Sequence, residues 1–247
     1  MIRALRSAWI WVATATLVLG WVPLIWVIKT FDRDPLRRRT ARWFRSLGPL
    51  VAKVNPAWKL HLSGLERVRP DGTYIIVSNH QSLADIPLIA HIRHDAKWLA
   101  KAELLQVPIF GWFMRVSGDI PVERTDRRKA AQSLLKCVQF LRKGCSVVFF
   151  PEGTRSRNGE VLPFNDGPFQ LAIREGIPVL PLVVEGTGDA LPRSTWMFGE
   201  SQDIHLRVLE PVTTTDWQDC ATLREYVRQR IIEELALLRR VPVPPPA

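Results

Sequence analysis

A histidine and an aspartate stand five positions apart in the segment "VSNHQSLADIP" (77–87), directly after a short apolar run. A carboxylate that hydrogen-bonds one imidazole nitrogen fixes the tautomer of the ring, so that the other nitrogen can accept a proton. His80 and Asp85 are therefore candidates for a general base and the acid that orients it. The structural alternative is a capping box, in which Asp85 reaches back to Ser82. Spacing alone leaves these two interpretations equally good.

Pro87 favours the first interpretation. A helix that began directly after Ser82 would hold Pro87 in its interior, where the missing N–H disrupts the hydrogen-bond ladder. Proline is more often the first residue of a helix. The sequence therefore predicts a loop over residues 80–86, in which Asp85 folds back onto the imidazole of His80.

Polar, turn-rich segments also follow two later apolar runs. "GDIPV" (118–122) leads into Glu123 and Arg124, and "SVVFF" (146–150) leads into "PEGTRSRNG" (151–159). In open α/β sheets, functional sites gather at the carboxyl ends of the strands. Three strands could thus bring one set of side chains to a common cleft: His80, Arg124, Glu152, Thr154 and Arg155. The alternative for the two arginines is a surface ion pair with Glu123 or Glu152.

Other common chemistries find less support. The sequence contains no GxSxG motif, so acyl transfer through a serine nucleophile is not indicated. Its three cysteines form no CxxC pair, which is typical of free thiols in a reducing compartment. His91, His94 and Asp95 could contribute to a zinc site, but no CxxC or HExxH motif accompanies them. A helix end at the surface is the better interpretation, and no metal site is expected.

Alternating strand and helix patterns predict the elements that would position these residues. Strands are expected at 74–78, 97–101, 118–122, 146–150, 178–184 and 204–209, and helices after Asp126, near 168–175 and over 216–238. This alternation predicts an α/β fold with a mixed, largely parallel sheet flanked by helices. The corresponding domain covers residues 59–240, and the Pro-rich residues 241–247 are expected to form a disordered tail.

The N-terminal residues 8–28 carry no charge. About 20 apolar residues suffice to cross the core of a bilayer. A signal peptide is a poorer interpretation, because its cleavage site at 13–15 would fall inside an apolar run that is longer than the usual one. Gly20 and Pro23 interrupt the run, and basic residues flank both of its ends. These features suit a segment that enters one leaflet and returns as well as a spanning helix.

Residues 1–58 are therefore expected to form an N-terminal helical membrane anchor. Residues 41–54 mix basic and apolar positions like an interfacial helix. Five tryptophans suit an interfacial aromatic belt: Trp9, Trp11, Trp21, Trp26 and Trp43. The alternative, a buried helix of a soluble core, fits poorly with these tryptophans. The richer basic flank follows the apolar run, which places the rest of the chain on the cytoplasmic face of the cytoplasmic membrane.

The balance of charge limits the class of partner. Thirty-four Lys and Arg against 24 Asp and Glu give a net charge of +10 and a pI near 10.1. Such an excess requires an acidic partner. Much of it lies beside the apolar N-terminus, so anionic membrane lipids are expected and nucleic acid is not. A non-catalytic membrane-binding protein would share the charge and the anchor, but it would not need His80 together with Asp85.

Four ordered segments, "NHQSLADIP", "GDIPVER", "FPEGTRSRNGEVLPF" and "IPVLPLVV", resemble the motif blocks of the glycerolipid acyltransferase family, in particular bacterial 1-acylglycerol-3-phosphate (lysophosphatidate) acyltransferases. The resemblance covers about residues 60–210. It implies that His80 deprotonates the sn-2 hydroxyl of 1-acylglycerol-3-phosphate, that Asp85 orients the imidazole, and that phosphatidic acid is the product. It also implies the residues that bind the glycerol-phosphate end: Arg124, Glu152, Gly153, Thr154 and Arg155.

The resemblance further implies the reactants. Acyl-CoA or acyl carrier protein would supply the acyl thioester to a lysophospholipid acceptor, without a metal or cofactor, and the N-terminal segment would be a two-helix anchor in one leaflet. One departure concerns the acceptor. Asn165 stands where the family usually has a lysine, and Asp166 follows it. The missing cation leaves another lysophospholipid or a lyso-aminolipid open as the acceptor.

Overall fold

A computed structural model describes residues 1–123 and 125–240 of the chain. Its centre is a seven-stranded sheet in the order β1-β7-β6-β2-β5-β3-β4. The strands are β1 (Trp58–Ser63), β2 (Ile75–Ser78), β3 (Ala96–Lys101), β4 (Ile120–Val122), β5 (Ser146–Phe149), β6 (Val179–Glu185) and β7 (Gln202–Val208). The predicted tail, residues 241–247, and Arg124 lie outside the described part of the chain.

All neighbouring strands are parallel except β6 and β7, which are antiparallel. The predicted mixed, largely parallel sheet is thus confirmed. All six predicted strands are present, with bounds that differ by a few residues. Strand β1 was not predicted, although the alternation of apolar and polar residues in "WKLHLS" is the ordinary signal of a half-exposed strand.

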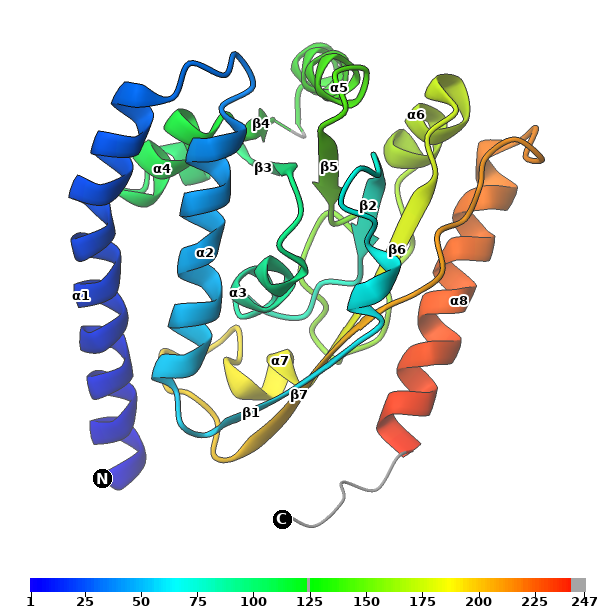
Figure 1. The fold of residues 1–247 in the computed structure, drawn as a ribbon. Coiled ribbons are helices and arrows are strands. Elements are labelled where there is room, and N and C mark those ends of the chain that lie inside the picture. Colours follow the sequence, from blue (N-terminus) through cyan, green and yellow to red (C-terminus); the bar gives the residue numbers. More distant parts are fainter. Residues whose placement is uncertain (124, 241–247) are drawn as a thin grey trace.

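Helices cover both faces of the sheet (Figure 1). Central strands β2 and β5 are buried at every residue, as expected for a parallel sheet packed on both sides. One core lies between the sheet and helices α5 (Arg127–Leu141), α6 (Gly167–Glu175) and α8 (Cys220–Arg240). The other lies beneath α3 (Asp85–Ile89) and α7 (Thr187–Ala190). Asp126 caps α5, as predicted, by accepting hydrogen bonds from the backbone N–H groups of Arg128 and Lys129.

Two long helices, α1 (Ile2–Phe31) and α2 (Arg38–Val54), lie side by side at one end of the molecule (Figure 1). Among the described residues, α1 is the helix that is long and apolar enough to cross a membrane. It continues through Pro23, so the predicted interruption does not end the helix. Most of its apolar surface is exposed, but Ile25 and Ile28 pack with Phe44 of α2 and Phe113 of α4 (Phe110–Ser117).

Helix α2 is therefore not a free interfacial helix. Its apolar residues Phe44 and Leu47 are buried inside the protein, against α1 and α4. Two of its basic residues pair with the sheet domain: Arg42 pairs with Asp95 at 2.9 Å, and Arg45 pairs with the buried Asp119. One apolar side of α2 thus serves contacts within the molecule, whereas Trp43 and Leu50 stay exposed, and the interfacial position of residues 41–54 stays a prediction.

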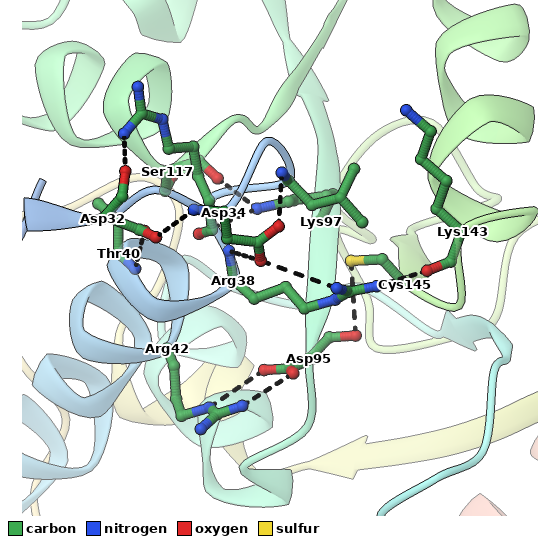
Figure 2. Close-up of polar contacts among 12 residues, drawn as sticks. Asp32, Asp34, Arg38, Thr40, Arg42, Asp95, Lys97, Ser117, Lys143 and Cys145 are labelled. Atoms are coloured by element: carbon green, nitrogen blue, oxygen red, sulfur yellow. Dashed lines mark hydrogen bonds and ion pairs between the residues drawn. The ribbon is translucent and has the colours of Figure 1, made fainter.

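The connection between α1 and α2 is bound to the domain by buried polar groups (Figure 2). Lys97 of β3 is fully buried, and its Nζ donates to the carbonyl of Ser117 at 2.5 Å and to that of Arg37 at 3.5 Å. Burial lowers the pKa of Lys97. Arg38 donates to the carbonyl of Lys143. The two N-terminal helices are thus built into the fold by polar as well as apolar contacts.

The described residues also form three short 3₁₀ helices: η1 (Leu65–Arg67), η2 (Ala90–Ile92) and η3 (Ala102–Gln106). Helix η2 continues α3 directly, and η3 follows the carboxyl end of β3. The segment between η3 and α4 contains Pro108, and Ile109 there has a positive φ of 63°.

Candidate active site

His80 and Asp85 are in direct contact at the carboxyl end of β2. His80 Nδ1 lies 2.7 Å from Asp85 Oδ2, and Asp85 is fully buried. The same oxygen accepts hydrogen bonds from the backbone N–H groups of Gln81, at 2.8 Å, and Ser82, at 3.0 Å. The two interpretations of the sequence are therefore compatible, because Asp85 orients the imidazole and also closes the turn at Ser82.

The predicted loop over 80–86 is too long by two residues. Helix α3 begins at Asp85, which places Pro87 at its third residue rather than its first. The first four N–H groups of a helix have no partner within the helix, so a proline costs no hydrogen bond there. A proline in the first turn therefore does not move the helix start to the proline itself.

The His80 imidazole is stacked against an aromatic ring. The rings of His80 and Phe150 are stacked, with centroids 3.9 Å apart and an interplanar angle of 20°. The His80 side chain is 15% exposed. Within the described chain its Nε2 has no hydrogen-bond partner, so this nitrogen is left for a bound molecule. The sequence placed Phe150 at the end of a buried strand, but periodicity cannot show which ring a side chain faces.

Glu152 is buried beneath this loop rather than exposed to a ligand. Its carboxylate accepts hydrogen bonds from the backbone N–H groups of His80, at 2.7 Å, and Leu162, at 3.0 Å. Burial raises the pKa of Glu152 to about 7. Both carboxylate oxygens thus have backbone partners, and the expected contact between Glu152 and a substrate stays a prediction.

Further contacts fix the loop after β2 to its neighbours. The Asn79 amide exchanges two hydrogen bonds with the backbone of Val184 in β6, each of 2.9 Å. Ser82 Oγ donates to the carbonyl of Leu191 at 2.7 Å. Ser156 N donates to the carbonyl of His80 at 2.8 Å, which joins the loops after β2 and β5. Asn79 was not identified from the sequence, since its partner is 105 residues away.

The turn after β5 presents Thr154 and Arg155. Gly153 has a φ of +73° and donates its N–H to the carbonyl of Phe150, so the turn requires a conformation that favours glycine. Thr154 is exposed and Arg155 is half-buried. Arg155 forms no ion pair with the described carboxylates, and burial and the nearby Arg193 lower its pKa. Its guanidinium is thus available to an anion. Arg124, the other expected cation, lies outside the described residues.

The departure at Asn165 and Asp166 has a structural explanation. Asn165 Nδ2 donates to the carbonyl of Pro151 at 2.7 Å, and Asp166 pairs with Arg224 of α8. The Asp166 charge is therefore compensated within the protein. Asn165 supports the start of the turn 151–155 rather than leaving a vacant position.

An apolar cavity of about 460 Å³ lies beside the His80 loop. Leu83 and Ala84 of that loop form one wall, and Ile10 of α1 and Leu47 of α2 contribute to another. A cavity of this composition suits a hydrocarbon chain. The N-terminal helices therefore help to form the site.

No metal-ligand cluster accompanies these residues. Among residues 1–123 and 125–240, no group of three or more His, Cys, Asp or Glu side chains could hold a metal ion. His91 Nδ1 lies 2.9 Å from the carbonyl of Leu88, and His94 Nε2 lies 2.9 Å from Ser146 Oγ. Both histidines therefore have structural partners.

Comparisons with known proteins give a consistent set of matches. Residues 59–185 match the family model for acyltransferases. The chain is 31% identical over 229 residues to "1-acyl-sn-glycerol-3-phosphate acyltransferase BAT2, chloroplastic" of Brassica napus, a match that covers 90% of this chain and 66% of that protein. It is 31% identical to a 1-acyl-sn-glycerol-3-phosphate acyltransferase of Chlamydomonas reinhardtii, over 95% of this chain and 71% of that one.

A bacterial structure extends the similarity to the whole fold. The crystal structure of the 1-acyl-sn-glycerophosphate (LPA) acyltransferase PlsC from Thermotoga maritima matches with a TM-score of 0.86 and 25% identity, over 98% of both chains. The similarity thus includes α1 and α2 as well as the sheet domain. The chain spans smaller parts of some plant relatives, such as 45% of LPAT1 of Arabidopsis thaliana.

Proposed function

Because the chain belongs to the acyltransferase family, we propose that it transfers an acyl chain from an acyl thioester to the sn-2 hydroxyl of 1-acylglycerol-3-phosphate, which forms phosphatidic acid. The observation that carries the proposal is the buried contact between His80 Nδ1 and Asp85, which leaves Nε2 for the substrate. The names of the relatives and of the structural neighbour support the choice of acceptor.

The geometry supports a direct transfer. His80 Nε2 takes the proton of the acceptor hydroxyl while the oxygen attacks the carbonyl carbon of the thioester. Asp85, bonded to Nδ1, stabilises the positive imidazolium that forms. The tetrahedral intermediate then collapses, the C–S bond breaks, and the leaving sulfur takes the proton from His80. A new C–O ester and a free thiol result, and no covalent enzyme intermediate is required.

Two neighbouring regions would hold the substrates. The acyl chain of the donor would occupy the apolar cavity between α1, α2 and the His80 loop. The phosphate of the acceptor would bind Arg155, which has no carboxylate partner in the described structure. Arg124, which follows β4 in the sequence, would supply a second cation. Acyl-CoA or acyl carrier protein would deliver the acyl group, and the reaction would use no metal or cofactor.

The N-terminal helices would bind the protein to the cytoplasmic membrane, with residues 59–240 on the cytoplasmic face. Both ends of α1 contact the rest of the protein. Near its start, Arg3 Nε donates to the carbonyl of Phe198 at 2.9 Å, and Trp11 Nε1 donates to that of Trp196 at 2.8 Å. At its end, the connection to α2 is bound by Lys97. A helix held at both ends suits insertion into one leaflet better than a full crossing, and anionic lipids would meet the basic surface.

The proposal is tested with purified protein, a panel of lysolipids and labelled acyl thioesters, with the product identified by mass. We expect phosphatidic acid from 1-acylglycerol-3-phosphate. His80→Ala and Asp85→Asn should each lower turnover by ~10²–10⁴, the usual effect of losing a general base or its orienting group. Circular dichroism would show that each variant is folded. Near-normal turnover by a folded His80→Ala protein would exclude the mechanism, and acylation of a lyso-aminolipid alone would exclude the acceptor.

A further inference from the structure

A second cavity, of about 790 Å³, lies on the other side of the His80 loop. Its walls come from Gln81, residues 156–159, the start of α7 and residues 192–194. This cavity and the apolar cavity are neighbours, because Leu191 lines the apolar cavity and the next residue, Pro192, lines this one. At this boundary, Ser82 Oγ of the His80 loop donates a hydrogen bond to the carbonyl of Leu191. The boundary is therefore part of the candidate active site.

Two cations of this second cavity have no carboxylate partner. Arg157 and Arg193 line it and are exposed, and no ion pair joins either of them to a described carboxylate. Arg239 also lines it, but it pairs with Glu185 at 3.1 Å. Asp189 contributes one carboxylate to the same wall. Two unpaired guanidinium groups that face a common space are the usual basis of a phosphate site.

The loop that carries Arg157 is held in place on both sides. Asn158 Oδ1 lies 3.2 Å from Ser156 Oγ and accepts the N–H of Glu160 at 3.1 Å. Ser156 N donates to the carbonyl of His80, as described above. On the opposite wall, Arg193 donates to the carbonyl of Arg155 at 3.4 Å. The backbone that carries Arg157 is thus held relative to His80, and the Arg193 guanidinium is bonded to the neighbouring turn.

The chemistry of the proposed reaction indicates what this cavity would hold. In a direct transfer, the acyl chain and the carrier lie on opposite sides of the thioester carbonyl. If the chain occupies the apolar cavity, the carrier must leave His80 in another direction, and the polar cavity begins at the next residue. Both coenzyme A and acyl carrier protein present the thiol on a phosphopantetheine arm, which has amide groups, a hydroxyl and a phosphate.

We propose that the polar cavity binds the phosphopantetheine arm of the acyl donor, with its phosphate on Arg157 and Arg193. This inference rests on the proposed function. Asp189 supplies an acceptor for the amide N–H groups and the hydroxyl of the arm, and Asn158 Nδ2 supplies a donor for an amide carbonyl. The acceptor phosphate then keeps Arg155, which lies outside this wall, so the two phosphates of the reaction have separate sites.

The test compares donors that share an acyl chain and differ in the carrier. Acyl-pantetheine has no phosphate, acyl-phosphopantetheine has one, and acyl-CoA and acyl carrier protein add a nucleotide or a protein. Each is assayed with saturating 1-acylglycerol-3-phosphate, using the unaltered protein, the double variant R157A/R193A and the matched control R69A/K136A. Arg69 and Lys136 are also exposed but lie outside the cavity, so the control removes the same charge.

We expect R157A/R193A to raise KM for every phosphate-bearing donor by about tenfold or more, since charge-assisted contacts are lost. KM for acyl-pantetheine and for 1-acylglycerol-3-phosphate should stay unchanged, as should all constants of the control. An additional loss with acyl-CoA or with acyl carrier protein alone would identify the source of the arm. An equal loss with acyl-pantetheine, a raised KM for the acceptor alone, or no change would each overturn the inference. If the unaltered protein uses none of the donors, the proposed function itself fails.

Discussion

Asp85 Oδ2 accepts hydrogen bonds from the His80 ring and from two backbone N–H groups, so one atom sets both the tautomer and the path of the chain. Glu152 is bonded to the same residue, because its carboxylate accepts the His80 backbone N–H. The candidate base is therefore held through its ring by one acid and through its backbone by another. The first acid was identifiable from the sequence, whereas the role of the second depended on burial that no local pattern predicts.

Glu152→Gln tests whether this residue positions His80 or binds substrate. An amide offers one acceptor oxygen and an NH₂ group that only donates, so one of the two backbone N–H groups, of His80 or Leu162, would lose its partner. We expect kcat to fall on the order of tenfold, with KM for 1-acylglycerol-3-phosphate unchanged. Glu160→Gln, an exposed residue of the same loop, is the control and should leave both constants unchanged. A raised KM with unchanged kcat would instead support a substrate contact.

Glu152→Gln should also change how the free energy of unfolding depends on pH. The folded-state pKa of Glu152 is raised from 4.5 to about 7, so the folded protein holds a proton between these values that the unfolded chain releases. The free energy of unfolding should therefore fall as the pH rises from about 4.5 to about 7, by up to about 3 kcal/mol. Urea unfolding over this range should show a weaker decline for Glu152→Gln, because the glutamine does not titrate. Equal slopes for the two proteins would contradict the burial argument.

At the scale of elements, the sequence predicted which strands and helices form better than it predicted which of them are in contact. The strand at 97–101 was predicted, but not that Lys97 is buried, because its ammonium bonds Ser117 and the α1–α2 connection, which are distant in sequence. Strand β7 was predicted, but not that it runs antiparallel to β6, since periodicity contains no information on pairing. The amphipathic pattern of helix α2 was predicted, but not the packing of Phe44 and Leu47 against α1 and α4, because the pattern fits a lipid surface and a protein surface equally well.

The attachment of α2 to the sheet domain can be measured with two arginines of the same helix. Arg45 pairs with Asp119, which is 2% exposed, whereas Arg42 is 66% exposed in its pair with Asp95. Arg45→Met should lower the free energy of unfolding by ~3–5 kcal/mol, because it leaves a buried carboxylate without its cation. Arg42→Met should cost about 1 kcal/mol or less. Urea unfolding in detergent micelles would measure both, and equal losses would show that the buried pair does not hold the helix.

At the scale of the whole molecule, the His80 loop lies where three environments meet. The loop is bordered by an apolar cavity under α1 and α2 and by a polar cavity next to α8. The third environment is the turn after β5, which carries the half-buried Arg155. Each environment suits one part of an acyl transfer between a lipid and a phosphorylated carrier. The N-terminal helices therefore have two functions in the proposed reaction, since they form the acyl-chain cavity and also present an apolar surface on their outer side.

The outer surface of α1 provides the test of membrane binding. Val12 and Leu19 are 65% and 56% exposed, whereas the buried Ile10 and Ile25 face the protein. Val12→Ser/Leu19→Ser removes apolar surface without entering the core, and burial of each such side chain in lipid is worth roughly 1.5–3 kcal/mol. We therefore expect binding to anionic vesicles to fall by at least about tenfold in a flotation assay, while thermal unfolding in detergent stays the same.

The control for this experiment lies on the opposite face of the sheet. Leu135 of α5 and Leu237 of α8 are 57% and 51% exposed, so Leu135→Ser/Leu237→Ser removes similar apolar surface from a different side. Vesicle binding by this control should match that of the unaltered protein, because these helices cover the face of the sheet away from α1 (Figure 1). Equal losses in the two double variants would mean that the membrane is contacted without a defined orientation. Since α1 and α2 line the apolar cavity beside the His80 loop, a defined orientation on the bilayer is what would bring lipid substrates close to His80.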